Sequence, residues 1–454
     1  MAFMNSSFGA WKPLDADGLI VKMRRHDLLY LCGFTAILGC AAYYRGGFLE
    51  FELNYVLLGL GLLTGVYWIV SPGDSSVPAM DRRLSWSLIT VLFYVAFQLV
   101  PLPVWLLQIL SPARAEHLKA LDRVVPVTWG SLSVMPGATM AHLFRLAAYA
   151  LVLVTACRIA THHRSQPWVT AFPILVVGSL EALLGLLQYL AGTGKSRLAQ
   201  GTYPNHSHFA DLLDLILPFA IMGAIALARR ESRSASTLLS TALMAIAAVI
   251  MFLAIVCTLS GSGFISCLAG LMFMAIIGTN RTMGTGLRWG TIAAVIVLTG
   301  VAFFLLPLDP VVERFAGEAR LEEGSRPSLW GDALKVVRVY PIFGSGLGTF
   351  EEALYQHSTV LHDLVIDYAH NDYLQLLVEL GSAGFLIGCA LAAAVVQTVL
   401  RRALRDSRPE NRAHAIAATA ALAAFAIHCF YNFNFYAPAN ALTAAYIAGI
   451  SLYD

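Results

Sequence analysis

The stretch 236-STLLSTALMAIAAVIMFLAIVCT-258 contains no charged residue and is long enough to cross a lipid bilayer. A transmembrane helix needs about 20 mostly apolar residues, and eleven other stretches of the chain meet the same condition. The twelve predicted spans are residues 28–44, 55–71, 86–110, 141–160, 168–192, 209–228, 236–258, 262–279, 289–307, 372–400, 413–431 and 436–453.

The overall composition agrees with a chain that lies in a membrane. Hydrophobic residues make up 58% of its 454 residues and charged residues only 13%, against about 45–50% and roughly 25% in soluble domains. This excludes a set of cytosolic domains and an intrinsically disordered chain, and the net charge of +2 gives no sign of nucleic-acid binding. The seven cysteines lie in apolar stretches without a C-x-x-C pair, as small core residues do. We therefore predict an all-α, polytopic membrane protein in which residues 1–454 form one integral membrane domain.

The distribution of basic residues predicts the orientation of the spans. Short loops on one side, such as 401-RRALRDSRPENR-412, hold most of the 30 lysines and arginines, and such loops face the cytoplasm. Residues 1–27 lack the features of a signal peptide and are predicted to be a cytoplasmic tail, which leaves both termini inside. The outer side then carries the loops 111–140, 193–208 and 308–371, the last of them a large loop between spans nine and ten.

The large outer loop contains a predicted amphipathic helix at residues 327–339, with Pro327 in its first turn. Its apolar residues recur at the spacing of one helix face: Trp330, Ala333, Leu334 and Val337. Such a helix lies on the outer membrane face or caps a cavity.

Polar residues collect where this loop enters span ten, in 367-DYAHNDYLQLLVELGSAGF-385. The candidates there are His370, Asn371, Asp372, Gln375 and Glu379. An unperturbed imidazole has a pKa of about 6.5, which suits His370 to accepting a proton near neutral pH. Glu379 lies about two turns into the span, deep enough to favour a partner. Helix capping and helix packing remain the alternative explanation for the whole group.

A second candidate is Arg326 in 324-GSRPSLWGDAL-334, followed by 341-PIFGSGLGTFEE-352. An arginine at the start of a helix can bind phosphate oxygens together with free backbone N–H groups; the alternative is a solvated surface arginine. The glycine run 344–348 follows a helix rather than preceding one, so we interpret it as a tight turn and not as a nucleotide-binding loop.

The third group lies in 195-KSRLAQGTYPNHSHFADLLDLILP-218. It comprises Lys195, Arg197, Asn205, His206, His208, Asp211 and Asp214. The H-x-H pattern has no further ligand at a diagnostic spacing, so a polar cavity wall is favoured over a metal site. Two lone charges, Arg145 and Glu181, indicate an internal ion pair or a polar cavity, and their roles stay open, as do those of Asp211 and Asp214.

All three groups fall on the outer side of the predicted topology, whereas the inner side offers only short basic loops. A reaction that uses a cytoplasmic nucleotide is therefore disfavoured. An enzyme of this design needs an activated substrate at the outer surface, and lipid diphosphates fit because their charge is clustered and their tail stays in the bilayer.

The motifs quoted above, together with the pattern of some twelve spans and one large late outer loop, resemble the O-antigen ligase and O-antigen polymerase superfamily. The resemblance covers roughly residues 197–385 and includes "G-T-[FY]-x-N-x-N-H-F-A", in which this chain has Ser207 in place of the second asparagine. It implies a metal-independent, inverting membrane glycosyltransferase of the GT-C type without a cofactor, in the bacterial inner membrane with a periplasmic active site. Its partners would be an undecaprenyl diphosphate-linked glycan, lipid A–core or another glycan acceptor, and membrane lipids.

The resemblance also implies roles for single residues. His370 corresponds to the outer-face histidine that deprotonates or orients the acceptor hydroxyl, and Arg326 to the loop arginine that stabilises the diphosphate leaving group. Arg197 corresponds to a second arginine near the outer end of span five. The remaining predicted contacts to the diphosphate and the glycan are Lys195, Asn205, His208, Asn371 and Glu379.

Other functions fit parts of the pattern. Within the superfamily, a polymerase would join carrier-linked repeats instead of transferring a glycan to lipid A–core, and some relatives use proteins or exopolysaccharides. A transporter also has about twelve spans, but the two halves show no repeat and no paired broken helices. A structural assembly factor would not explain why polar residues converge on one face.

Overall fold

The computed structural model describes residues 24–71, 80–124, 126–192, 198–230, 234–278, 289, 293, 296–297, 326–357 and 366–453. Within them the chain is helical apart from one pair of two-residue antiparallel strands, β1 (Leu102–Pro103) and β2 (Trp129–Gly130). The expected all-α class is therefore confirmed for the described part of the chain.

The first half of the chain forms a row of long helices that are joined by short connections. Its elements are α1 (Arg25–Tyr43), the 3₁₀ turn η1 (Arg45–Gly47), α2 (Glu50–Val70), α3 (Arg82–Phe97), α4 (Val104–Leu110), α5 (Pro112–Asp122), α6 (Pro136–His162) and α7 (Trp168–Ala191). In the second half the elements are α8 (His206–Ala228), α9 (Ala235–Cys257), α10 (Gly261–Ile277), α13 (Arg326–Val339), α14 (Phe350–His357), α15 (Asp372–Arg405), α16 (Pro409–His428), η2 (Asn434–Tyr436) and α17 (Pro438–Ser451).

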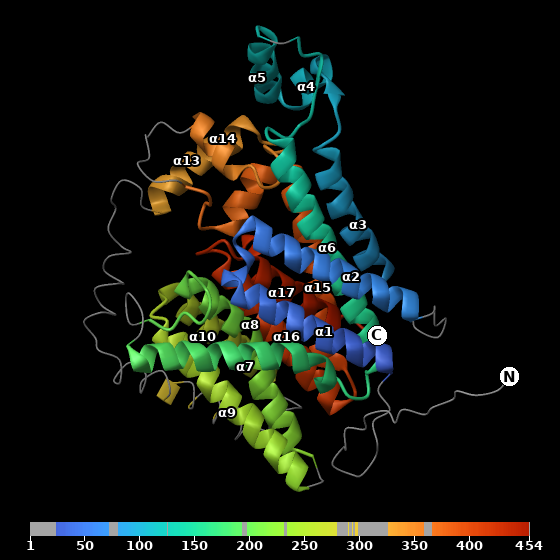
Figure 1. The fold of residues 1–454 in the computed structure, drawn as a ribbon, viewed down its shortest axis with the longest axis vertical. Helices are drawn as coiled ribbons and strands as arrows, with labels where there is room; N and C mark the ends of the chain where they lie inside the picture. Colours follow the sequence, from blue (N-terminus) through green and yellow to red (C-terminus); the bar gives the residue numbers. More distant parts are fainter. Residues whose placement is uncertain are drawn as a thin grey trace, which may run out of the picture.

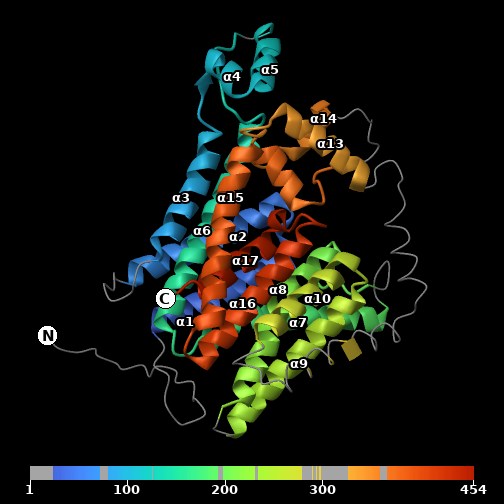
Figure 2. The ribbon, with the colours of Figure 1, turned by 180° about the vertical axis from the view of Figure 1, so that it is seen from behind.

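Three helices from the second half form the centre of the bundle. Helix α8 is buried along most of its length, α16 packs against both α8 and α10, and α17 packs against α6. The helix α15 runs beside α3 and α16 on the far face of the bundle (Figure 2).

Within the described residues, seven helices are long and apolar enough to cross a membrane: α1, α2, α6, α7, α8, α9 and α15. The chain is therefore all-helical and polytopic, but the expected number of twelve spans is not confirmed. The described part of α10 is a shorter apolar helix, and α17 has 14 residues. Most of the predicted span 289–307 lies outside the described residues.

The predicted span 86–110 is wrong as a single helix. Helix α3 ends at Phe97, and α4 begins only at Val104 after a turn that contains Pro101 and Pro103. Proline lacks the N–H that a continuing helix needs. At the end of α3 the amide Nε2 of Gln98 donates instead to two carbonyl groups of distant segments.

The small helices gather at one end of the molecule. The α4–α5 hairpin projects from the end of α3 and α6, and α13 and α14 lie at the same end (Figure 1). The hairpin has a small core of its own, formed by Leu107, Ala115, Leu118 and Leu132.

A buried carboxylate ties three helices together away from that end. Asp27 of α1 is fully buried and accepts a hydrogen bond from the hydroxyl of Tyr67 in α2 at 3.0 Å. Ring nitrogens of His162 and His163, at the end of α6, lie 3.2 and 3.0 Å from its other oxygen. The three partners satisfy a group that would otherwise be costly to bury.

Candidate active site

A cavity of about 430 Å³ lies between the N-terminus of α8, the start of α13 and the segment before α15. It is enclosed by the turn after η1, the N-terminus of α8, the first turn of α13, the segment before α15 and the segment between α16 and α17. The residues that line it are Phe48, Pro204, Asn205, His208, Leu329, Ile366, Asp367, Tyr368, His370 and Phe433. Two histidines from sequence regions far apart therefore share one cavity.

His370 is held on the cavity wall by a tightly bonded segment. The indole N–H of Trp330 in α13 donates to the carbonyl of Ala369 at 2.9 Å, and the N–H of Ala369 donates to Gln375 at 3.0 Å. His370 itself has a φ of 49°, a left-handed conformation that is uncommon for residues other than glycine. Such strain persists where the surroundings impose it, and it is found most often at functional sites.

The helix α15 starts directly behind this histidine. Asn371 is its N-cap, and the side-chain oxygen accepts a hydrogen bond from the N–H of Leu374 at 3.1 Å. The Asn371 side chain is thus engaged in capping, as the alternative explanation from sequence allowed. Asn205 caps α8 in the same way by accepting from Ser207 at 2.8 Å, and it also lines the cavity.

The ring of Phe433 joins the two histidines. His208 lies against it at 4.5 Å between ring centroids and His370 at 4.9 Å, both edge-on. Tyr368 stacks on the ring at 4.1 Å with nearly parallel planes, and Phe48 packs against both Phe433 and His208. Such aromatic pairs stabilise the wall beyond simple burial, and they fix the two imidazoles relative to each other.

Asp372, next to His370, anchors the segment that carries Phe433. Its Oδ2 accepts hydrogen bonds from the backbone N–H groups of Asn434 at 2.7 Å and Phe435 at 3.1 Å. In return, the N–H of Asp372 donates to the carbonyl of Cys429 at 2.8 Å. The start of α15 and the α16–α17 connection therefore form one rigid unit.

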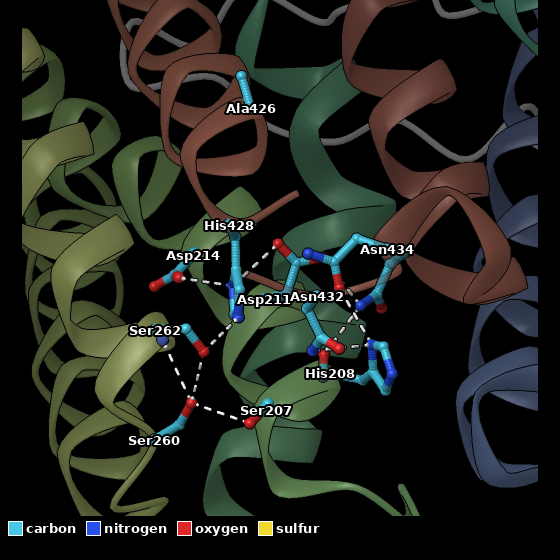
Figure 3. A network of polar contacts seen from close by, with 12 residues as sticks. Ser207, His208, Asp211, Asp214, Ser260, Ser262, Ala426, His428, Asn432 and Asn434 are labelled. Carbon is cyan, nitrogen blue, oxygen red and sulfur yellow. Dashed lines mark hydrogen bonds and ion pairs between the residues drawn. The ribbon is translucent and has the colours of Figure 1, made fainter. Parts of the chain in front are cut away.

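Behind the cavity lies a network of buried polar groups (Figure 3). The Nδ1 atom of His428 in α16 is 3.3 Å from Asp211 and 3.5 Å from Asp214, both in α8. The other ring nitrogen of His428 lies 3.2 Å from the hydroxyl of Ser262 in α10. Asp211 also accepts from Asn440 at 2.9 Å, and the same amide group donates to the carbonyl of His208. This network ties four helices to the wall that carries His208.

The lining of the cavity combines the carboxylate of Asp367 with neutral hydrogen-bonding groups. Burial raises the pKa of Tyr368 to about 12, with the Arg145 guanidinium opposing the rise and the carboxylate of Asp367 adding to it. Tyr368 is therefore a neutral phenol at physiological pH. Arg145 of α6 lies within 3.2 Å of His142, whose ring packs on Tyr436.

No group of three or more His, Cys, Asp and Glu side chains within the described ranges is arranged to hold a metal ion. What the cavity does offer is imidazole, phenol and amide groups next to an aromatic wall. Such a set can bind hydroxyl-rich molecules and can accept a proton from one of their hydroxyl groups.

Comparison with known proteins finds a family match for part of the chain. Residues 246–389 match the family model described as O-antigen ligase. This match supports the O-antigen ligase superfamily for the matched region. No curated protein matches the chain. The match includes α10, α13, α14 and the first half of α15, and with them Arg326 and His370.

The ligase-superfamily match does not include every wall of the cavity. His208 and Asn205 precede the matched residues, and Phe433 follows them. The cavity is completed by the helices on either side, so the family region and its flanking helices act as one unit.

The structure describes the three predicted cationic residues to different extents. Arg326 is the first residue of α13, one turn before the cavity-lining Leu329, but its side chain is not among those described. Lys195 and Arg197 lie outside the described residues. The helix expected at 327–339 is confirmed as α13.

Glu379 contacts protein groups rather than the cavity. It is fully buried, its Oε2 accepts from the N–H of Gly348 at 2.7 Å and from the hydroxyl of Tyr436, and its Oε1 accepts from Gln375 at 3.2 Å. The expected tight turn at 344–348 packs against the backbone of Glu379. Gly344 has a φ of 74°, and a Cβ at this position would lie only 2.2 Å from the Glu379 carbonyl oxygen. Glu379 therefore fastens this turn to α15.

We expect Glu379→Ala to destabilise the protein. The change leaves the N–H of Gly348 and the hydroxyl of Tyr436 buried without their acceptor, at a cost of about 1–3 kcal/mol for each group. Thermal unfolding of the purified protein in detergent should show a clearly lower Tm. Glu116→Ala, at an exposed position on α5, is the control and should leave Tm unchanged. Equal Tm values for the two variants would refute this role of Glu379.

The segment 428-HCFYNFNFYAPAN-440 is not among the candidate groups that the sequence patterns indicate. Its ends belong to the predicted spans eleven and twelve, yet it supplies His428, Phe433, Asn434, Tyr436 and Asn440 to the site. The available signal was a histidine and three asparagines within otherwise apolar sequence, since polar groups at membrane depth are costly and tend to be functional.

Proposed function

We propose that this protein is an O-antigen ligase-type glycosyltransferase. It moves a glycan from undecaprenyl diphosphate to a sugar hydroxyl of lipid A–core, in a cavity that faces the periplasm of the bacterial inner membrane. The observation that carries the proposal is the pair His370 and His208 on one aromatic wall, in a chain whose matched region belongs to this superfamily. In the proposal, both chain termini are cytoplasmic.

The reaction is an inverting displacement at the anomeric carbon of the glycan, without a metal ion. The acceptor oxygen forms the new bond to the anomeric carbon as the bond to the diphosphate oxygen breaks. His370 takes the proton of the acceptor hydroxyl, and undecaprenyl diphosphate leaves with the electron pair of the broken bond. General-base assistance of this kind contributes about 10²–10⁴-fold to a rate.

Arg326 stabilises the charge that develops on the diphosphate. As the first residue of α13 it stands where the free N–H groups of a helix and its dipole favour an anion. Leu329, one turn later, lines the cavity. Arg197 and Lys195 are proposed to hold the same diphosphate, while Asn205, His208, Asn371 and Glu379 form or support the glycan site.

The aromatic wall supports the choice of a sugar as the transferred group. Phe433, Tyr368 and Phe48 offer flat apolar faces to the C–H groups of a pyranose ring, and Tyr368 adds a neutral O–H. A polymerase would use the same donor and the same cavity but a second carrier-linked glycan as acceptor, so only the acceptor distinguishes the two functions.

A gel-based transfer assay on the purified protein tests the proposal. The protein receives undecaprenyl diphosphate-linked glycan with or without lipid A–core. Transfer of label to lipid A–core is the expected result, whereas a ladder that grows on the carrier without lipid A–core would identify a polymerase. No product under either condition, together with uptake of the lipid-linked glycan or its headgroup into proteoliposomes, would refute the proposal in favour of a transporter.

A further inference from the structure

His208, the second histidine of the cavity, has a hydrogen-bond partner at one ring nitrogen and none among the described residues at the other. The Nδ1 atom of His208 lies 3.0 Å from the side-chain oxygen of Asn434. Because an amide oxygen only accepts, Nδ1 must carry the proton, and Nε2 then carries the lone pair in the neutral ring. Nε2 is buried and has no hydrogen-bond partner among the described residues, although His208 lines the cavity.

Neighbouring side chains hold the backbone of both residues that form this hydrogen bond. The backbone of Asn434 is held by Asp372, through the 2.7 Å bond from its N–H to the carboxylate. The backbone of His208 is held by Asn440, whose amide donates to the His208 carbonyl at 2.9 Å. The amide of Asn432 lies farther from Nδ1, at 3.5 Å, so the Asn434 oxygen is the nearer group. The tautomer of His208 is thus set by a prearranged acceptor.

An unpaired buried acceptor destabilises a protein unless a ligand satisfies it. The Nε2 atom of His208 needs a hydrogen-bond donor, and a sugar hydroxyl is such a donor. His208 and His370 both contact the Phe433 ring and both line the cavity, so a sugar bound there can present different hydroxyls to the two imidazoles.

We propose that His208 binds the acceptor sugar by accepting a hydrogen bond at Nε2 from a second hydroxyl, next to the one that attacks. Asn434 is the positioning residue that keeps the proton of His208 on Nδ1. The inference rests on the proposed glycosyl transfer and deepens it, because it names a specificity contact for the acceptor that is separate from the general base. An acceptor that lacks this neighbouring hydroxyl would bind less well.

Two replacements of His208 test the contributions of its two ring nitrogens separately. In His208→Asn the side-chain amide takes the place of Nδ1 and keeps the bond to Asn434, but nothing remains at the Nε2 position. In His208→Gln the longer side chain reaches the Nε2 position and can accept there. We expect His208→Gln to retain kcat/KM for the acceptor about tenfold better than His208→Asn, the usual effect of one hydrogen bond. A purely structural role predicts the opposite order, and that result would overturn the inference.

A second measurement does not depend on activity. Solid-state NMR of the ¹⁵N-histidine-labelled wild-type protein reports which ring nitrogen of each histidine is protonated, and His208→Asn identifies the His208 signal among the 12 histidines. Protonated Nδ1 with unprotonated Nε2 is expected, and Asn434→Leu should change this signal. His208→Gln gives the same assignment where His208→Asn does not fold, and protonation at Nε2 of His208 in the wild type would overturn the inference. A wild-type protein that shows the expected signal but forms no product would contradict the proposed function rather than the arrangement around His208.

Discussion

Replacement of His370 by alanine lowers the rate of glycan transfer by about 10²–10⁴-fold, the contribution of a general base. The side chain lies on the cavity wall, whereas its backbone is held by bonds from Trp330 and Gln375 to the neighbouring Ala369, which the replacement leaves intact. The protein should therefore stay folded and elute from size-exclusion chromatography as the wild type does. Initial rates from the gel-based assay measure the effect.

The matched control for this variant is His117→Ala. His117 is a half-buried histidine of α5 that contacts Tyr340 and does not line the cavity. Its loss should leave the transfer rate within about twofold of the wild-type rate, since surface changes away from a site have small effects. Similar losses in both variants would mean that His370 acts through stability and not through chemistry.

The second large effect is expected at Arg326. Arg326→Ala should slow transfer by about 10²–10³-fold, as does removal of a donor that stabilises charge in the transition state. The loss should appear mainly in kcat, because the charge on the leaving oxygen grows only as the bond breaks. Arg326→Lys should recover part of the rate, since lysine keeps the charge but loses the fork of N–H donors.

Arg338→Ala provides the comparison at the other end of the same helix. Arg338 is exposed in the last turn of α13, so its removal changes the charge of the protein equally without touching the first turn. Full transfer activity of Arg326→Ala, or an equal loss in both variants, would show that Arg326 does not act on the diphosphate.

The hydropathy of the chain predicted the long helices well and failed where local chemistry ends a helix. The spans expected at 141–160 and 209–228 lie within α6 and α8. The span expected at 86–110 is broken because Pro101 and Pro103 follow Phe97, and because Gln98 forms bonds to Phe343 and Glu379. The prolines were visible in the sequence, whereas the partners of Gln98, more than 240 residues away, were not.

Some single residues of the site were predictable from the sequence, but their arrangement was not. Sequence patterns selected His370 and His208, which both line the cavity, yet nothing in the local sequence shows that Phe433 lies between them. The bond from His208 to Asn434 joins residues 226 positions apart. Contacts of this length depend on how the helices pack, which a single sequence does not encode in any local pattern. Glu379 shows the limit of a prediction from a single residue. Its predicted depth in a span suggested a contact with the substrate, whereas its hydrogen-bond partners in the structure are protein groups.

The most direct measurement follows both products of transfer in a single reaction. The purified protein in lipid nanodiscs receives undecaprenyl diphosphate-linked glycan and lipid A–core, and the modified acceptor and the released undecaprenyl diphosphate are quantified over time. We expect one undecaprenyl diphosphate for each glycan transferred, in wild type and His117→Ala alike, and neither product with His370→Ala. Glycan transfer without release of the carrier, or an undiminished rate in His370→Ala, would contradict glycosyl transfer at the cavity that His370 and His208 share.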